Sequence, residues 1–383
     1  MAEAAIKKPG RPDMALILSE SDASVAAMFT RNRVKAAPVR LDMARVRSGL
    51  ARAVVVNSGN ANACTGVRGM KDAVEAAALA ARGLGVPEGR VLVCSTGVIG
   101  VPMPMDRVRP AVAALVEKAG GSGLEEAARA IMTTDSFPKF ISQEVRAGGR
   151  AGVIAGICKG AGMIAPDMAT MLCFIMTDLA VEKRALKAAL REAVRDSFNL
   201  ITIDGDMSTN DTVIAMANGM AGNRPLAEGS RDFRAFSSAL SEVCSGLARM
   251  IARDGEGATR LVEIEVSGAR DEAQARRAAL SLANSLLLKT AIHGGDPNVG
   301  RVMAALGAAG VGIREESTDV YMGRLRVVRR GVVDAAAALR AAAELRGEEV
   351  SISVRLGLGH GRARALTCDI SEEYVRINAE YTT

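Results

Sequence analysis

Length, composition and charge set the first limits on this chain. Its 383 residues exceed what one core usually holds, so two or three lobes are expected, and 49% hydrophobic with 24% charged residues is typical of a soluble globular protein. A net charge of +6 is spread over 49 basic and 43 acidic residues without a basic block that carries aromatics, which argues against nucleic-acid binding.

Cysteine and histidine usage exclude further classes. Six cysteines form no C-x-x-C pair, which favours buried thiols in a reducing, cytoplasmic compartment. Only two histidines are present, so no zinc or other metal site is predicted. No run approaches the roughly 18 apolar residues of a membrane span, and no apolar signal segment follows the first basic residues.

Strands and helices alternate through the first third of the chain. Apolar runs predict strands at 14–19, 52–56 and 91–94, and alanine-rich stretches predict helices at 70–84, 106–119 and 124–133. The segment 57–66 holds three asparagines and two glycines and is interpreted as a structural turn. Small residues at 95–100 either direct backbone N–H groups at a ligand or form a tight turn, and both interpretations stay open.

A glycine-rich turn connects two predicted strands in the middle of the chain. The strands cover 152–158 and 171–176, and Lys159 lies in the turn between them. Gly160 and Gly162 formally fit a dinucleotide-binding pattern, but Pro166 and a strand follow where that pattern needs a helix, so it is rejected. Thr170 lies where the loop enters the core, and this position alone is ordinary for a structural threonine.

The second half is predicted to begin with helices and to end with alternating elements. Helices are expected at 180–197, 231–253, 270–291 and 333–346, turn residues at 293–301, and strands at 318–328, 349–355 and 363–370. The segment 204–212 begins like a calcium loop, but Thr209 stands where glycine is required, so it is interpreted as a structural or substrate-side loop. Aromatic and β-branched residues in the last ten positions predict a docked C-terminus.

Two short motifs need the rest of the chain for their interpretation. Ser136 and Lys139 match the serine–lysine motif of penicillin-recognising enzymes, but the companion motifs are absent.

Taken together, eight segments in order along the chain resemble the ornithine acetyltransferases, also called glutamate N-acetyltransferases, of the cyclic arginine pathway. These segments are 57–66, 95–100, 132–139, 159–178, 204–212, 254–260, 296–301 and 374–383. Val299 stands where the family has tryptophan.

The resemblance implies a fold and an activity. The fold is α/β, with a layered helix–sheet–sheet–helix core of the self-processing N-terminal-nucleophile type and a smaller C-terminal α/β lobe at about 260–383. Cleavage between Ala169 and Thr170 would give an alpha chain, 1–169, and a beta chain, 170–383, assembled as two of each. The enzyme would transfer acetyl from N2-acetyl-L-ornithine to L-glutamate through acetyl-Thr170. No cofactor is implied, and whether acetyl-CoA also serves as donor stays open.

The resemblance also assigns the site. Thr170 would be the nucleophile, and Thr96 with Gly97 would form the oxyanion hole. The implied substrate-binding residues, besides Thr170, are Ser136, Lys159, Glu256, Asn378 and Thr383, with serine at 136 in place of the usual threonine.

The implied nucleophile also makes chemical sense. An N-terminal threonine carries its own base, because its α-amino group has a pKa of roughly 7.7–8.0. Two alternatives remain: an N-terminal-nucleophile amidohydrolase or aminopeptidase that passes the acyl group to water, and a non-catalytic binding protein.

Overall fold

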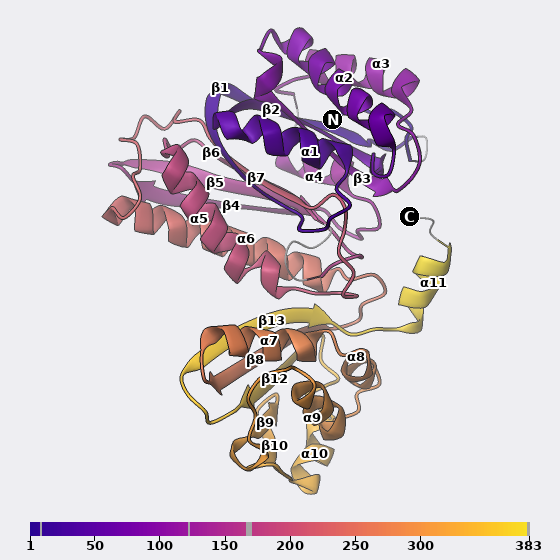
Figure 1. The fold of residues 1–383 in the computed structure, drawn as a ribbon, viewed down its shortest axis with the longest axis vertical. Helices are drawn as coiled ribbons and strands as arrows, with labels where there is room; N and C mark the ends of the chain where they lie inside the picture. The colour runs from indigo at the N-terminus through magenta and orange to yellow at the C-terminus, as the bar shows by residue number, and fades with distance from the viewer. Residues whose placement is uncertain (8–9, 122, 166–170, 381–383) are drawn as a thin grey trace.

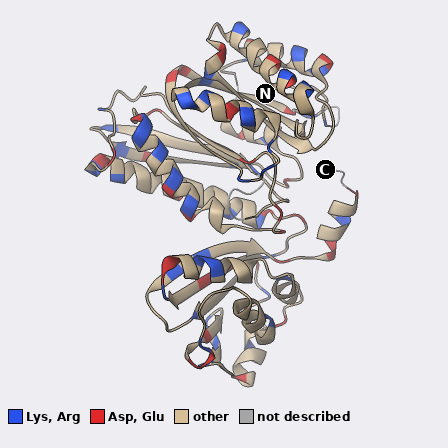
Figure 2. Cartoon of the chain, viewed as in Figure 1, with Lys and Arg blue, Asp and Glu red and all other residues tan. Residues whose placement is uncertain are grey.

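The computed structural model describes residues 1–7, 10–121, 123–165 and 171–380. Two β-sheets, each with its own helices, form a larger and a smaller lobe (Figure 1). Basic and acidic residues are interspersed over both lobes (Figure 2). None of the helices in the described ranges has the length and apolar character needed to cross a bilayer.

The larger lobe contains a seven-stranded sheet whose order is β3-β2-β1-β7-β6-β5-β4. Its strands are β1 (Met14–Phe29), β2 (Leu50–Asn60), β3 (Val91–Val98), β4 (Lys139–Ala147), β5 (Arg150–Lys159), β6 (Leu172–Thr177) and β7 (Thr212–Ala217). β1 joins two halves of the sheet, since its first part pairs with β2 and its last part with β7. The pairing with β2 is irregular between Leu18 and Ala23, where a bulge bends a strand.

Alternate side chains on the strands show that the two halves face each other. Val54 of β2 and Phe174 of β6 belong to one buried cluster between the halves, which also receives helix α4 (Leu124–Ile131). Val55 instead packs against α2 (Gly66–Leu84) and α3 (Met105–Glu117). Cys173 packs against α5 (Lys183–Asp196) and α6 (Arg231–Arg253). The predicted helix–sheet–sheet–helix layering is therefore confirmed, with both sheet layers belonging to one folded sheet.

The smaller lobe is built on a six-stranded sheet of order β11-β10-β9-β12-β8-β13. Its strands are β8 (Leu261–Ala269), β9 (Asp319–Met322), β10 (Leu325–Arg329), β11 (Val332–Val333), β12 (Glu349–Arg355) and β13 (Gly361–Cys368). Its helices are α7 (Glu272–Ala283), α8 (Leu286–His293), α9 (Val299–Gly307) and α10 (Ala335–Ala341). A separate apolar cluster fills this lobe. The chain then ends its described part in α11 (Glu372–Glu380), which lies beside the larger lobe (Figure 1).

The structure corrects several predicted elements. The single helix expected at 270–291 is two helices, because the hydroxyl of Ser285 accepts from Leu288 N at 3.3 Å and starts α8. The turn expected at 293–301 runs into α9, whose first turn is capped by Asn298. Helix α1 (Ala37–Arg45) and strands β4 and β7 were not predicted. In β7 all six residues are buried, so the period-two signal of a half-exposed strand is absent.

Candidate active site

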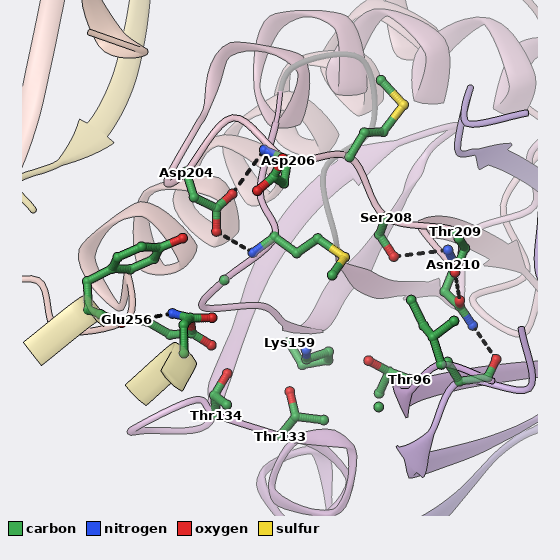
Figure 3. Close-up of a pocket in the computed structure, with 18 residues that line it drawn as sticks. Thr96, Thr133, Thr134, Lys159, Asp204, Asp206, Ser208, Thr209, Asn210 and Glu256 are labelled. Atoms are coloured by element: carbon green, nitrogen blue, oxygen red, sulfur yellow. Dashed lines mark hydrogen bonds between the residues drawn. The ribbon is translucent and has the colours of Figure 1, made fainter. Parts of the chain in front are cut away.

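A cavity of about 420 Å³ lies where β3, β5, the loop after α5 and α11 converge (Figure 3). Five of the predicted site residues line it, namely Thr96, Gly97, Lys159, Glu256 and Asn378. Further side chains that line it include Thr133, Thr134, Asp204, Asp206, Ser208, Thr209, Asn210 and Tyr374. The structure thus gathers residues from six separate parts of the sequence around one space.

Lys159 lies in the middle of this space, with Thr96 on one side and Glu256 on the other (Figure 3). It is the last residue of β5 and is only 3% exposed. Its Nζ lies 3.9 Å from Asp135 Oδ2, which is too long for a hydrogen bond. Burial lowers the pKa of Lys159, although Asp135 and Glu256 oppose that effect. A buried ammonium in this position suits an anionic ligand such as a carboxylate.

A buried ionic network lies directly behind Lys159. Asp135 Oδ1 is 2.7 Å from Lys139 Nζ and accepts a hydrogen bond from Gly160 N at 2.6 Å. Lys139 Nζ also lies 2.5 Å from Asp254 Oδ2. Burial opposes ionisation of Asp135, but Lys159, Lys139 and the Gly160 N–H together hold its pKa below the ordinary value. The network fixes the end of β5 and therefore the position of Lys159.

Ser136 belongs to this network rather than to the cavity wall. Its backbone N donates to Asp254 Oδ2 at 3.0 Å, and its hydroxyl donates to Asp254 Oδ1. It is not among the lining residues, whereas Thr133 and Thr134 of the same segment are. Lys139 binds two carboxylates instead of the Ser136 hydroxyl, so the pair does not have the arrangement of a serine–lysine enzyme. The role predicted for Ser136 stays a prediction.

The Thr96–Gly97 pair ends β3 at the cavity. Gly97 has φ +131°, and a Cβ there would lie 2.2 Å from the carbonyl carbon of Gly59, so only glycine fits. Asn210 holds the neighbouring chain in place, because its Nδ2 donates to Ala61 O at 2.7 Å and to Ser95 O at 2.8 Å. A rigid, closely packed strand end of this kind can present polar groups to a developing negative charge.

Glu256 and helix α11 form the opposite wall. Asn378 Nδ2 donates to Glu256 Oε2 at 2.8 Å, and Glu256 N donates to Ala161 O at 2.8 Å. A Cβ at Gly162 would lie 2.4 Å from the Glu256 carboxyl carbon, so glycine leaves room for that side chain. Although α11 has no buried residue, it reaches the cavity through Asn378 and Tyr374. The C-terminal segment therefore docks at the site, as its sequence predicted.

The loop 204–210 closes the remaining side. Asp204 accepts hydrogen bonds from Met163 N at 2.5 Å and Ile164 N at 2.9 Å, and burial raises its pKa. This loop was interpreted as structural or substrate-side; it makes structural hydrogen bonds and lines the cavity, and contact with substrate stays a prediction. Thr133, Thr134 and Tyr374 line the cavity but were not among the site residues predicted from the sequence. For the two threonines the polar segment 132–139 was a signal, but it did not show which hydroxyls face the cavity.

Three predicted site residues, Ala169, Thr170 and Thr383, lie outside the described residues. The residue that follows the predicted cleavage site is described. Met171 is 1% exposed, and its N donates to Asp211 Oδ1 at 3.0 Å. Leu172, the next residue, pairs with Lys159 in the sheet. The chain therefore enters β6 beside Lys159.

Comparisons with known proteins cover the whole chain. Residues 1–383 match the sequence model of the ArgJ family. The arginine biosynthesis bifunctional protein ArgJ of Geobacter sulfurreducens is 54% identical over 382 residues, which are 100% of this chain and 97% of the relative. That of Symbiobacterium thermophilum is 48% identical over 374 residues, which are 98% of this chain and 93% of the relative. A crystal structure of the bifunctional protein from Bacillus halodurans superposes with a TM-score of 0.53 at 41% identity, covering 54% of this chain and 98% of that chain.

Proposed function

This chain belongs to the ArgJ family, and we propose that it transfers the acetyl group of N2-acetyl-L-ornithine to L-glutamate through an acetyl ester on Thr170. One observation carries the proposal. Lys159, the Thr96–Gly97 pair and Glu256 line one cavity, and β6, which begins two residues after Thr170, pairs with β5 beside Lys159. Thr170 itself lies outside the described residues, and the described chain resumes at Met171, one residue before the partner of Lys159 in the sheet.

The reaction begins with self-cleavage between Ala169 and Thr170. The new α-amino group accepts the proton of the Thr170 hydroxyl, whose oxygen attacks the acetyl carbonyl of the donor. The C–N bond breaks, and ornithine leaves with the proton on its α-nitrogen. The amine of glutamate then attacks the ester, takes the acetyl group and returns a proton to the threonine oxygen. In each half, donors at Thr96 and Gly97 hold the oxyanion, and one such donor is typically worth about 2.7–4 kcal/mol.

The charges around the cavity orient the donor. Lys159 would bind the α-carboxylate, because its ammonium is buried and its one ion pair within the described residues is as long as 3.9 Å. Glu256 would bind the side-chain ammonium of ornithine from the opposite wall (Figure 3). Thr133 and Thr134 line the cavity and offer the hydroxyl contact that the resemblance implied for Ser136. Charge pairs of this kind fix orientation more than they add affinity.

A second activity and an assembly complete the proposal. The relatives are named bifunctional, which supports an additional amino-acid N-acetyltransferase activity with acetyl-CoA as donor. We expect the cleaved chains to assemble as two alpha and two beta chains in the cytoplasm. The chain from Bacillus halodurans is matched almost completely by 54% of this chain, a fraction close to that of residues 170–383. The amidohydrolase alternative is less well supported, because the relatives are named for arginine biosynthesis.

Intact-mass analysis combined with an acetyl-transfer assay tests the proposal. Purified wild type should contain two chains, 1–169 and 170–383, and incubation with N2-acetyl-L-ornithine alone should add one acetyl group to the second chain. Glutamate should then remove that group and become acetylated, and water should do so much more slowly. Thr170→Ala should stay uncut and unlabelled. An active wild type that is still continuous at 169–170 would refute the proposal.

A further inference from the structure

The side chain of Asn210 ties together two strand ends beside the cavity. Asn210 is 5% exposed and lies on the same side of the cavity as Thr96 (Figure 3). Its Nδ2 donates to Ser95 O in β3 at 2.8 Å and to Ala61 O, directly after β2, at 2.7 Å. Because the amide nitrogen carries two hydrogens, both are used on backbone carbonyl groups, and neither is left to bind a substrate.

These two hydrogen bonds hold the Thr96–Gly97 pair at both of its ends. Ser95 O is the carbonyl directly before the pair, and a peptide unit is planar, so fixing this oxygen fixes the plane from which the pair starts. Directly after the pair, Val98 O accepts a hydrogen bond from Ala61 N at 2.9 Å, and Ala61 O is bound to Asn210. One side chain therefore fixes one end of the pair directly and the other end through a single residue.

The asparagine-rich segment 57–62 supports the same arrangement. Ser95 Oγ donates to Asn57 Oδ1 at 2.6 Å, and Asn57 Nδ2 donates to Asn60 O at 2.8 Å. Ser95 is thus held by its hydroxyl as well as by its carbonyl group. This segment was interpreted from the sequence as a structural turn, and the residue that it holds is the one that precedes the Thr96–Gly97 pair.

The loop that carries Asn210 fixes the orientation of its amide. Thr209 Oγ1 donates to Asn210 Oδ1 at 2.5 Å, and Asn210 N donates to Ser208 Oγ at 3.0 Å. The backbone of the loop is held as well, because Ala36 N donates to Thr209 O at 3.0 Å. With its oxygen bound to a hydroxyl, the amide directs its nitrogen at the two carbonyl groups, which can only accept hydrogen bonds.

We propose that Asn210 is the positioning residue of the oxyanion hole. This inference rests on the proposed function, in which donors at Thr96 and Gly97 hold the oxyanion. Such donors act because they are in place before the charge develops, and a displacement of about 1 Å can cost about 100-fold in rate. Asn210 belongs to the second proposed product, whereas Ser95 and Ala61 belong to the first. The hole therefore takes its active shape from contacts between the two chains.

The test compares two buried asparagines that make similar contacts. Asn210→Ala removes both donors without adding a charge. Asn223→Ala is the matched control, because Asn223 is 7% exposed and its Nδ2 also donates to two carbonyl groups, Ala180 O at 3.1 Å and Arg224 O at 2.8 Å. Asn223 is not among the described residues that line the cavity. On fully cleaved protein, Asn210→Ala should lower kcat about 10- to 100-fold and change KM less than about twofold, whereas Asn223→Ala should keep the wild-type kcat.

The two half-reactions separate positioning of the oxyanion hole from substrate binding. One hole serves both halves of the proposed reaction. Single-turnover acetylation by N2-acetyl-L-ornithine and deacetylation by glutamate should therefore slow by a similar factor in Asn210→Ala. A residue that binds one substrate would slow only the half-reaction of that substrate. A residue that only stabilises the fold would lower the urea midpoint, as Asn223→Ala should, and leave both rates unchanged.

Each outcome of these measurements decides the inference. Asn210→Ala with the wild-type kcat, or with a loss confined to one half-reaction, would overturn it and leave the proposed function intact. A wild type that forms no acetyl ester would instead remove the proposed function. If Asn210→Ala does not fold or is not cleaved, Thr209→Val decides, because it removes only the hydroxyl that binds Asn210 Oδ1. It should slow both half-reactions about 2- to 10-fold, and unchanged rates would contradict the inference.

Discussion

The two lysines that share Asp135 should have opposite roles, and exchanging each for methionine separates them. Lys159 lines the cavity, whereas Lys139 is 0% exposed and lies behind it. In Lys159→Met the Asp135 carboxylate keeps Lys139 at 2.7 Å and the Gly160 N–H at 2.6 Å, so stability should change little. In Lys139→Met, Asp135 and Asp254 both lose their nearest cation. Removing one partner of a buried pair typically costs about 3–5 kcal/mol.

The effects of the two substitutions on the reaction rate should be the opposite of their effects on stability. A hydrogen bond to a charged group is worth about 1.5–3 kcal/mol, so loss of the Lys159 ammonium from the donor carboxylate should lower kcat/KM about 10- to 150-fold. Lys139→Met that remains folded should keep most of its kcat/KM. Initial rates with N2-acetyl-L-ornithine and urea unfolding curves measure both quantities. Rates are compared on fully cleaved protein, so that incomplete cleavage is not counted as slower transfer.

Either of two results would contradict this assignment. Wild-type kcat/KM in Lys159→Met would show that this ammonium does not bind the donor. Equal losses of stability in the two variants would show that both lysines are part of the same structural network.

Three further changes test other parts of the site and the assembly. Gly97→Ala should lower the rate of acetyl transfer about 100-fold or more, because the new Cβ would lie 2.2 Å from the backbone of β2. Gly100→Ala is the control: Gly100 also has a positive φ, +84°, but a Cβ there has no atom within 4 Å, so this variant should stay active. Asn378→Ala loses a 2.8 Å hydrogen bond to the cavity carboxylate and should raise KM about 2- to 10-fold, whereas Arg376→Ala, whose ion pairs stay within α11, should not. The Tm of cleaved wild type should rise more steeply with protein concentration than that of uncut Thr170→Ala, and equal slopes would count against two separate chains.

How far the sequence predicts the fold depends on how local each signal is. The apolar run that becomes β6 is buried on both faces and bounded by polar residues, so its strand was predictable. β1 was predicted at 14–19 but continues to Phe29, because pairing with β7 extends it past a polar stretch that local patterns interpret as its end. The folding of one sheet into two facing layers follows from that long strand, and no short window of sequence contains it.

The site residues, too, were predictable only where a local sequence signal marks them. The segment 132–139 was identified, but Thr133, Thr134 and Ser136 could not be ranked, because the direction of each side chain depends on a turn held by Lys139 and Asp254. Glu256 lies between two glycines in sequence, yet it is only 9% exposed and packs against Gly162, which no local pattern shows. Contacts between segments a hundred residues apart decided both outcomes.

The sheet order explains why the proposed cleavage can create a nucleophile without dismantling the fold. The cut falls in the connection between β5 and β6, so strands β1 to β5 belong to the first product and β6 and β7 to the second. β6 pairs with β5 along one edge, and β7 pairs with β1 along the other. The second product is therefore held between two strands of the first by ladders that the cut does not touch. Because Lys159 ends β5 and pairs with Leu172, the ladder that would keep the two chains together extends to the lysine that lines the cavity.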